Sequence, residues 1–236
     1  MHLHRYCALA LVLAGLVGVT AAQAEEAAPA GAPEDATPLW AREDDTIMTD
    51  VPEPPALDLV IARFAAALPE RCDWALGGSQ DMRVPEVFDF TYRYDFDEAD
   101  APGRPLKVYR FFCSQGAYNA QHAYFLWDER SGLRPVSFAS PTYEVEFEKP
   151  DNPDSAATAV RLTGMGTVPT LVNSGIDPDT GTLTSMGYWR GLGDASAGGT
   201  WVLQEGEYRL ESFDVDPSYD GEVTYFRVVD FGPGGP

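Results

Sequence analysis

The sequence predicts a mainly β protein built from antiparallel sheets, arranged as a sandwich or barrel-like, with one N-terminal amphipathic helix before them. Two observations lead to this fold class. Apolar residues alternate with polar ones in many short segments, and turn-forming residues separate these segments without helical patterns in between. Parallel strands need long crossover connections, so short strands joined by tight turns favour antiparallel pairing. The pattern is equally compatible with a barrel and with a sandwich.

The helix is predicted between Pro55 and Pro69, in the segment ALDLVIARFAAAL. Large apolar residues recur there every three or four positions, which gives a helix one apolar stripe. These residues are Leu57, Val60, Ile61, Phe64 and Leu68. We interpret the stripe as a core-facing surface, and the flanking prolines as the limits of the helix.

From Val84 onward the apolar period changes to two, which is the period of a strand with one buried face. In the segment 87–94 the aromatic residues fall on one side, and in 143–148 three apolar residues alternate with three glutamates. Turns are predicted at 128–132, at 177–181 and at Glu205-Gly206. Further strands are predicted at 106–113, 123–128, 134–138, 168–173, 182–189, 200–204, 207–213 and 223–231.

Residues 1–24 have the pattern of a secretory signal peptide. Arg5 lies in a short polar start, an apolar run follows at 8–19, and Ala22-Gln23-Ala24 matches a small-x-small cleavage site. The apolar run is too short for a membrane helix. We therefore expect cleavage near Ala24, no membrane span in the mature form, and a periplasmic or secreted location.

The chain after the leader divides into three parts by composition. Residues 25–56 are rich in Ala, Pro and acidic residues and predict a disordered tether, because they cannot bury enough apolar surface to offset the entropy of ordering. Residues 57–231 are long enough for one β-rich globular domain with its own core. Residues 232–236 predict a flexible Gly/Pro tail.

The chain is strongly acidic, with 16 basic and 37 acidic side chains and a net charge of -21. Such a field repels nucleic-acid phosphates and anionic lipid surfaces, so neither is an expected partner. A negative field of this size would attract a cationic protein or peptide. The simpler explanation of the acidic surplus is that it keeps the protein soluble.

Two cysteines remain after the leader, Cys72 and Cys113. In an oxidising compartment the simplest interpretation is one disulfide between them. The alternative, a pair of redox-active thiols, lacks the C-x-x-C spacing that lowers a thiol pKa.

The stretch GLGDASAGG at 191–199 does not have the features of a phosphate-binding loop. It lacks the Gly-Lys-Ser/Thr of a P-loop, and it leads into a strand where a dinucleotide fingerprint leads into a helix. Arg190 is its only positive charge. A nucleophilic triad is also disfavoured, because His122 is the only histidine after the leader and no G-x-S-x-G motif is present. We expect His122 to be structural, and no cofactor is predicted.

Acidic loops make calcium the metal to consider, although none has the ligand spacing of an EF-hand loop. The simpler interpretation is that these Asp and Gly residues make hairpin turns. The candidate carboxylates are Asp95, Asp97, Glu98, Asp100, Asp177, Asp179, Asp214, Asp216, Asp220 and Glu222.

Paired carboxylates could also hydrolyse glycosidic bonds, if two of them lie about 5 to 10 Å apart in a cleft. With so many acidic residues, the sequence does not identify the pair. Trp189 and Trp201 could stack on sugar rings, whereas aromatic residues in alternating strands more often belong to the core.

Four stretches together resemble the domain-of-unknown-function 1176 family of exported bacterial proteins. They are CSQGAYN at 113–119, FLWDERSGLRPVSF at 125–138, LVNSGIDPDTGTLTSMGYWRGLGD at 171–194 and GGTWVLQEGEYRLESF at 198–213. The similarity covers roughly residues 57–231. It implies export, and it carries over no activity or site because the family has none established.

This chain departs from the family at a pair of cysteines. Family members usually carry one cysteine directly after the Gly-Asp of the glycine-rich loop and another before the final strand. Here these places hold Ala195 and the region of Ser218 and Tyr219. The resemblance therefore implies that the loop connects two strands and is cross-linked elsewhere in the family.

From these observations we expect a non-catalytic binding or interaction domain of the bacterial envelope, with a cationic protein or peptide as partner. The alternative is a carboxylate-based hydrolase acting on envelope polysaccharide. A deep pocket with two nearby carboxylates would favour the alternative.

Overall fold

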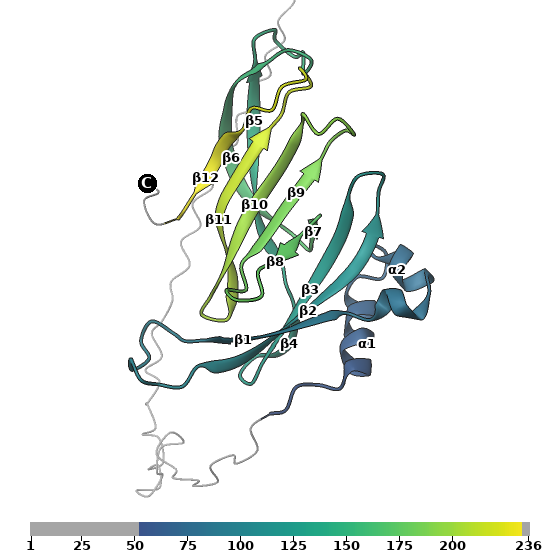
Figure 1. The fold of residues 1–236 in the computed structure, drawn as a ribbon, viewed down its shortest axis with the longest axis vertical. Coiled ribbons are helices and arrows are strands. Elements are labelled where there is room, and N and C mark those ends of the chain that lie inside the picture. Colours follow the sequence, from purple (N-terminus) through teal and green to yellow (C-terminus); the bar gives the residue numbers. More distant parts are fainter. Residues whose placement is uncertain (1–51, 233–236) are drawn as a thin grey trace, which may run out of the picture. The chain divides into compact units, whose positions relative to one another are not determined.

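The computed structural model describes residues 52–232, and its strands form two five-stranded antiparallel sheets and one two-stranded ribbon (Figure 1). The mainly β, antiparallel character predicted from the sequence is confirmed. The predicted leader, most of the predicted tether and the last four residues of the predicted tail lie outside the described residues.

The first sheet has the strand order β1-β2-β3-β4, and β7 pairs with β3 beside β4. Its strands are β1 (Glu86–Tyr92), β2 (Arg104–Gln115), β3 (Ala120–Asp128), β4 (Gly132–Pro135) and β7 (Thr170–Val172). The predicted turn at 128–132 joins β3 to β4. The Asp128 carboxylate stabilises it by accepting hydrogen bonds from the backbone N–H groups of Arg130 and Ser131.

The second sheet has the order β12-β11-β10-β9-β8. Its strands are β8 (Gly175–Ile176), β9 (Leu183–Tyr188), β10 (Ser196–Gln204), β11 (Glu207–Asp216) and β12 (Phe226–Asp230). The predicted turns at 177–181 and at Glu205-Gly206 join β8 to β9 and β10 to β11. Glu205 and Gly206 have φ values of 53° and 79°, as a two-residue hairpin turn requires.

A long ribbon completes the strands and consists of β5 (Phe138–Phe147) and β6 (Ala157–Val168). The sequence did not predict β6. Its residues, ATAVRLTGMGTV, include two glycines and show no apolar alternation, because most of its side chains remain exposed. The final predicted strand, 223–231, is longer than β12, since the backbone N–H of Thr224 donates to the carboxylate of Asp216 instead of to a neighbouring strand.

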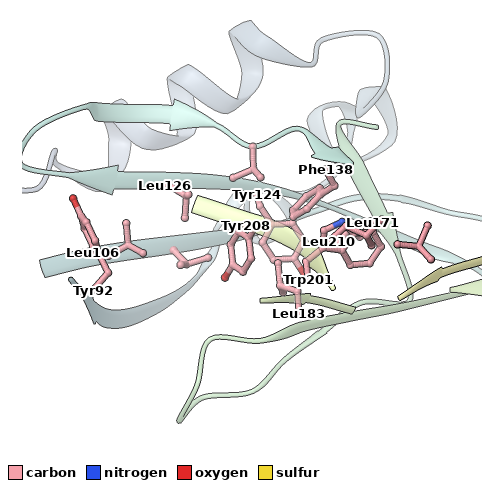
Figure 2. Packing of buried hydrophobic residues seen from close by; sticks show 13 residues of the cluster. Tyr92, Leu106, Tyr124, Leu126, Phe138, Leu171, Leu183, Trp201, Tyr208 and Leu210 are labelled. Atoms are coloured by element: carbon pink, nitrogen blue, oxygen red, sulfur yellow. The ribbon is translucent and has the colours of Figure 1, made fainter. Parts of the chain in front are cut away.

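The main core lies between the two sheets (Figure 2). Leu106 and Val108 on β2 and Tyr124 and Leu126 on β3 point toward the second sheet. The second sheet contributes Leu183, Trp201, Tyr208, Leu210 and Val229. Each buried side chain of this size contributes about 1.5–3 kcal/mol to stability.

The opposite face of the first sheet is covered by helices (Figure 1). Helix α1 (Leu57–Ala67) places Val60 and Phe64 against it, and the ring of Phe64 stacks on that of Phe111 at 4.2 Å between centroids. Two short segments follow, α2 (Asp73–Gly77) and the 3-10 turn η2 (Gln80–Arg83). The sequence did not predict these two, since each is too short to show a helical period.

The predicted disulfide joins Cys72 and Cys113, and both residues are fully buried in the core beneath the helices. Cys72 precedes α2 and Cys113 lies on β2, so the bond attaches the helical segment to the first sheet. Its sequence separation of 41 residues makes the closed loop long.

Replacing both cysteines with alanine is expected to lower the free energy of unfolding by about 4 kcal/mol, the chain-entropy value for a loop of this length. Urea unfolding of the double variant and of the unmodified protein measures the difference. Equal unfolding free energies would contradict the assignment of a stabilising cross-link.

Candidate binding site

The glycine-rich loop is the connection between β9 and β10. The backbone N–H of Trp189 donates to the carbonyl of Ala195 at 2.9 Å and closes the loop, and Gly193 turns the chain with a φ of 75°. A side chain at position 193 would be strained by that φ. The loop leads from strand to strand, so its geometry is that of a hairpin connection and not of a phosphate cradle.

Arg190 and Asp194 form a clamp between this loop and the loop that joins β11 to β12. The guanidinium of Arg190 makes a two-point contact with the Asp194 carboxylate, with 2.6 Å from Nε to Oδ1. It also donates to the carbonyl of Tyr219 at 2.8 Å, and the N–H of Gly221 donates to Asp194 at 3.1 Å. The hydrogen bond from Arg190 is the main reason why the pKa of Asp194 falls to about 2. The clamp therefore remains charged at any physiological pH.

A second tie connects the same end of the second sheet to the first sheet. The side chain of Asn119, in the loop between β2 and β3, donates to the carbonyl of Tyr188 at 2.7 Å and accepts its N–H at 3.0 Å. Asn173, after β7, accepts the N–H of Ala120 at 2.8 Å and donates to the carbonyl of Met186 at 3.0 Å. These amides fix the β2–β3 loop against β9.

Aromatic and aliphatic side chains gather around these two sets of hydrogen bonds. We call the set the aromatic surface; it consists of the exposed Tyr118, Tyr188, Trp189 and Leu192 and the half-buried Tyr219. Tyr118 packs on Gly191, where a β-carbon would come within 2.7 Å of its ring. The rings of Trp189 and Tyr219 lie edge to face, 6.4 Å apart. Leu192 is 79% exposed and Trp189 is 42% exposed. Large apolar groups displayed together on fixed loops are typical of interaction sites.

Trp189 and Trp201 have different environments. Trp201 is only 2% exposed, and its indole N–H donates to the carbonyl of Ala139 at 3.0 Å inside the main core. It is a structural residue with no access to a ligand. Trp189 alone of the two can contact a partner.

Five of the calcium candidates have side chains engaged in local contacts. Asp97 pairs with Arg104, and Asp177 accepts the N–H groups of Asp179 and Thr180 at 2.8 and 3.0 Å. The buried Asp216 accepts the N–H of Thr224, Asp214 pairs with Arg227, and Asp220 accepts the N–H of Glu222. Asp95, Glu98 and Asp100 lie in the exposed loop between β1 and β2. Within residues 52–232, no three His, Cys, Asp or Glu side chains are placed to hold a metal ion.

His122 lies on β3 between β2 and β7, and it belongs to a small polar network that includes Ser174, which follows β7. Its Nδ1 lies 3.2 Å from the hydroxyl of Ser174, which is also 2.7 Å from the hydroxyl of Tyr124. Arg110 donates to the carbonyl of Ser174 at 3.0 Å. Ser174 is only 7% exposed, and its hydroxyl is shared between two side chains, so an attacking role is not supported.

One hollow has two carboxylates in its lining, and a glycoside hydrolase requires such a pair about 5 to 10 Å apart. It measures about 360 Å³ and is lined in part by Asp89 and Asp179. Asp89 forms an ion pair with Lys107. In the described part of the chain the carboxyl groups with a shifted pKa, those of Asp97, Asp128, Asp177 and Asp194, are all shifted downward. A general acid for glycoside hydrolysis needs a raised pKa, so these four carboxyl groups are unsuited to that role.

Comparisons of the sequence with protein-family models, with curated proteins and with solved structures found no match. None of the helices within residues 52–232 is long and apolar enough to cross a membrane.

Sequence reasoning singled out the glycine-rich loop, Arg190 and Trp189 without assigning a binding site to them, and it did not consider Tyr118, Asn119 and Asn173. The missed residues lie on other loops and meet the first group only through the pairing of the strands. Asn173 has a φ of 43°, a conformation in which asparagine is enriched, but the sequence shows only an asparagine at the end of a strand.

Replacing Asp194 with asparagine is expected to loosen the two clamped loops, because the amide cannot match the two-point contact with the Arg190 guanidinium. Amide hydrogen exchange in residues 189–195 and 217–225 should become faster. The matched control is Asp214→Asn, which breaks the more exposed pair with Arg227 and should leave these segments unchanged. Equal exchange in both variants would contradict the clamp.

His122 is expected to make stability depend on pH below neutrality. Burial, with the nearby charge of Arg110, lowers the pKa of His122 from 6.5 in the folded protein, while Glu86 opposes this shift. The folded state thus favours the neutral ring. The stability that the neutral ring contributes is fully present above pH 6.5 and is lost as the pH falls through the folded-state pKa. Urea midpoints at pH 7 and pH 5 should differ less in His122→Gln than in the unmodified protein. Equal differences would contradict the assignment.

Proposed function

We propose that the chain is an exported protein of the bacterial envelope, and that its β-rich domain binds a cationic protein or peptide without catalysing a reaction. The observation that carries this proposal is the aromatic surface, held by two sets of hydrogen bonds at one end of the sheets. Prearranged loops reduce the entropy that a binding site loses when its partner docks.

The location outside the cytoplasm is supported by two features. The sequence of residues 1–24 predicts a cleaved leader. The Cys72–Cys113 disulfide is the kind of bond that persists in oxidising compartments.

The class of partner is supported by charge. Cleavage after Ala24 would remove one arginine and no acidic residue, which leaves 15 basic against 37 acidic side chains. A surface charge of this size attracts cationic partners over a distance and raises their association rate at low salt. It also weakens the attraction of anionic polymers.

Membership of the domain-of-unknown-function 1176 family is part of the proposal. It is supported by the environment of the two positions at which the family usually carries cysteines. Ala195 and Ser218 are both fully or almost fully buried, and the Arg190–Asp194 clamp joins the loops on which they lie. The clamp would take the place of the cross-link.

The alternative function is hydrolysis of envelope polysaccharide by two carboxylates. The hollow beside Asp89 and Asp179 is the place where the described residues would allow it. The ion pair with Lys107 argues against it, because it already engages the Asp89 carboxylate.

Binding and hydrolysis can be separated in one set of measurements. The exported chain should retain envelope polypeptides at low salt and release them at about 1 M salt, where the screening length falls to about 3 Å. Incubation with envelope polysaccharides should release no reducing ends above the level of the Asp89→Asn/Asp179→Asn variant. Hydrolysis that this double variant abolishes would overturn the proposal in favour of the alternative.

A further inference from the structure

We infer that the aromatic surface is the site at which this protein recognises arginine or lysine side chains on an exposed basic segment of another polypeptide. The inference rests on the proposed function and assigns its binding site. Two kinds of group meet there: aromatic rings, whose faces attract cations, and carboxylates, which attract them over a longer range.

The loops already hold one guanidinium in this way. The guanidinium carbon of Arg190 lies 4.8 Å from the centroid of the Tyr219 ring, within the range of a cation–π contact. The Asp194 carboxylate binds the edge of the same guanidinium. Hydrogen bonds to Asp194 raise the pKa of Arg190, and the negative charge of Asp154 adds to this effect. The surroundings of Tyr219 therefore stabilise a cation.

The rest of the surface remains available to a second cation. Trp189 lies edge to face with Tyr219 and is 42% exposed, and an indole face is the strongest aromatic partner for a guanidinium. Tyr118, which packs on Gly191, and the exposed Leu192 extend the apolar area and can cover the aliphatic stem of an arginine or lysine.

Carboxylates border this area on two loops. The N–H of Tyr219 donates to the carbonyl of Pro153 at 2.6 Å, which places the loop between β5 and β6 beside the loop between β11 and β12. The acidic residues on these two loops are Glu148, Asp151, Asp154, Asp220 and Glu222, and the basic residue is Lys149. Arg190 and Asp194 neutralise each other, so the border carries a local excess of negative charge.

A neutral sugar would use the same rings but would gain nothing from these charges. An anionic polysaccharide would be repelled by them. Charge complementarity therefore favours a basic polypeptide over both.

The test is calorimetric titration of the exported chain with a short glycine–serine peptide that carries two arginine residues, at about 0.15 M salt, where the screening length is about 8 Å. Trp189→Ala should weaken binding about tenfold, as expected for loss of a central aromatic contact. The matched control is Trp74→Ala, because Trp74 is 50% exposed but lies on α2. It should leave the affinity unchanged.

A second pair of variants tests the carboxylates. Asp154→Asn/Glu222→Gln should weaken binding several-fold and flatten its salt dependence, since two charges at the border are lost. Glu98→Gln/Asp100→Asn removes the same charge from the β1–β2 loop and should have little effect. The same peptide with glutamine in place of arginine should not bind.

Three results would overturn the inference. One is an equal loss of affinity in the Trp189 and Trp74 variants. That result would mean that the peptide binds through charge at a surface other than the aromatic surface. Another is saturable binding of a neutral oligosaccharide that Trp189→Ala abolishes, which would make the surface a sugar platform. The third is absence of peptide binding together with hydrolysis that depends on Asp89 and Asp179, which would overturn the proposed function itself.

Discussion

The rest of the structure depends on the burial of β2 and β3 on both faces. Alternate residues of these strands serve two cores: Leu106 and Val108 meet the second sheet, while Phe111 meets Phe64 of α1. A shift of one residue in register would turn each of these side chains to the other face of the sheet and disrupt the packing of both cores. The pairing of β2 with β3 is thereby fixed, and so is the loop between them, which carries Tyr118 and Asn119.

The candidate site arises where this fixed hairpin meets the second sheet. Asn119 binds the backbone of β9, and Arg190 binds the loop that follows β11. Each contact links elements that are distant in sequence, so the position of the exposed rings depends on the packing of the whole domain. The same packing leaves Trp189 exposed, because the hydrogen bonds that fix these loops use backbone groups, amides, a guanidinium and a carboxylate and not its ring.

Much of the fold could be predicted from the sequence, because strands with one buried face show a period of two and their turns contain Asp and Gly. The β6 strand was not predicted because its exposed residues show no such period. Helix α2 was not predicted because one helical turn is too short to show a helical period. The candidate site could be predicted only in part. Trp189 and Trp201 occur in similar aromatic segments, and only the three-dimensional pairing shows that one is exposed and the other buried.

The helical segment and the aromatic surface are held by different chemistry. A covalent bond between Cys72 and Cys113 attaches the helical segment, and ionic and amide contacts position the aromatic surface. Both cysteines are fully buried, so a reductant would reach the disulfide only after local opening of the helical segment, and it would not act on the ionic and amide contacts. The attachment of the helices can thus be lost by a redox reaction while the contacts that position the exposed rings, which contain no sulfur, persist.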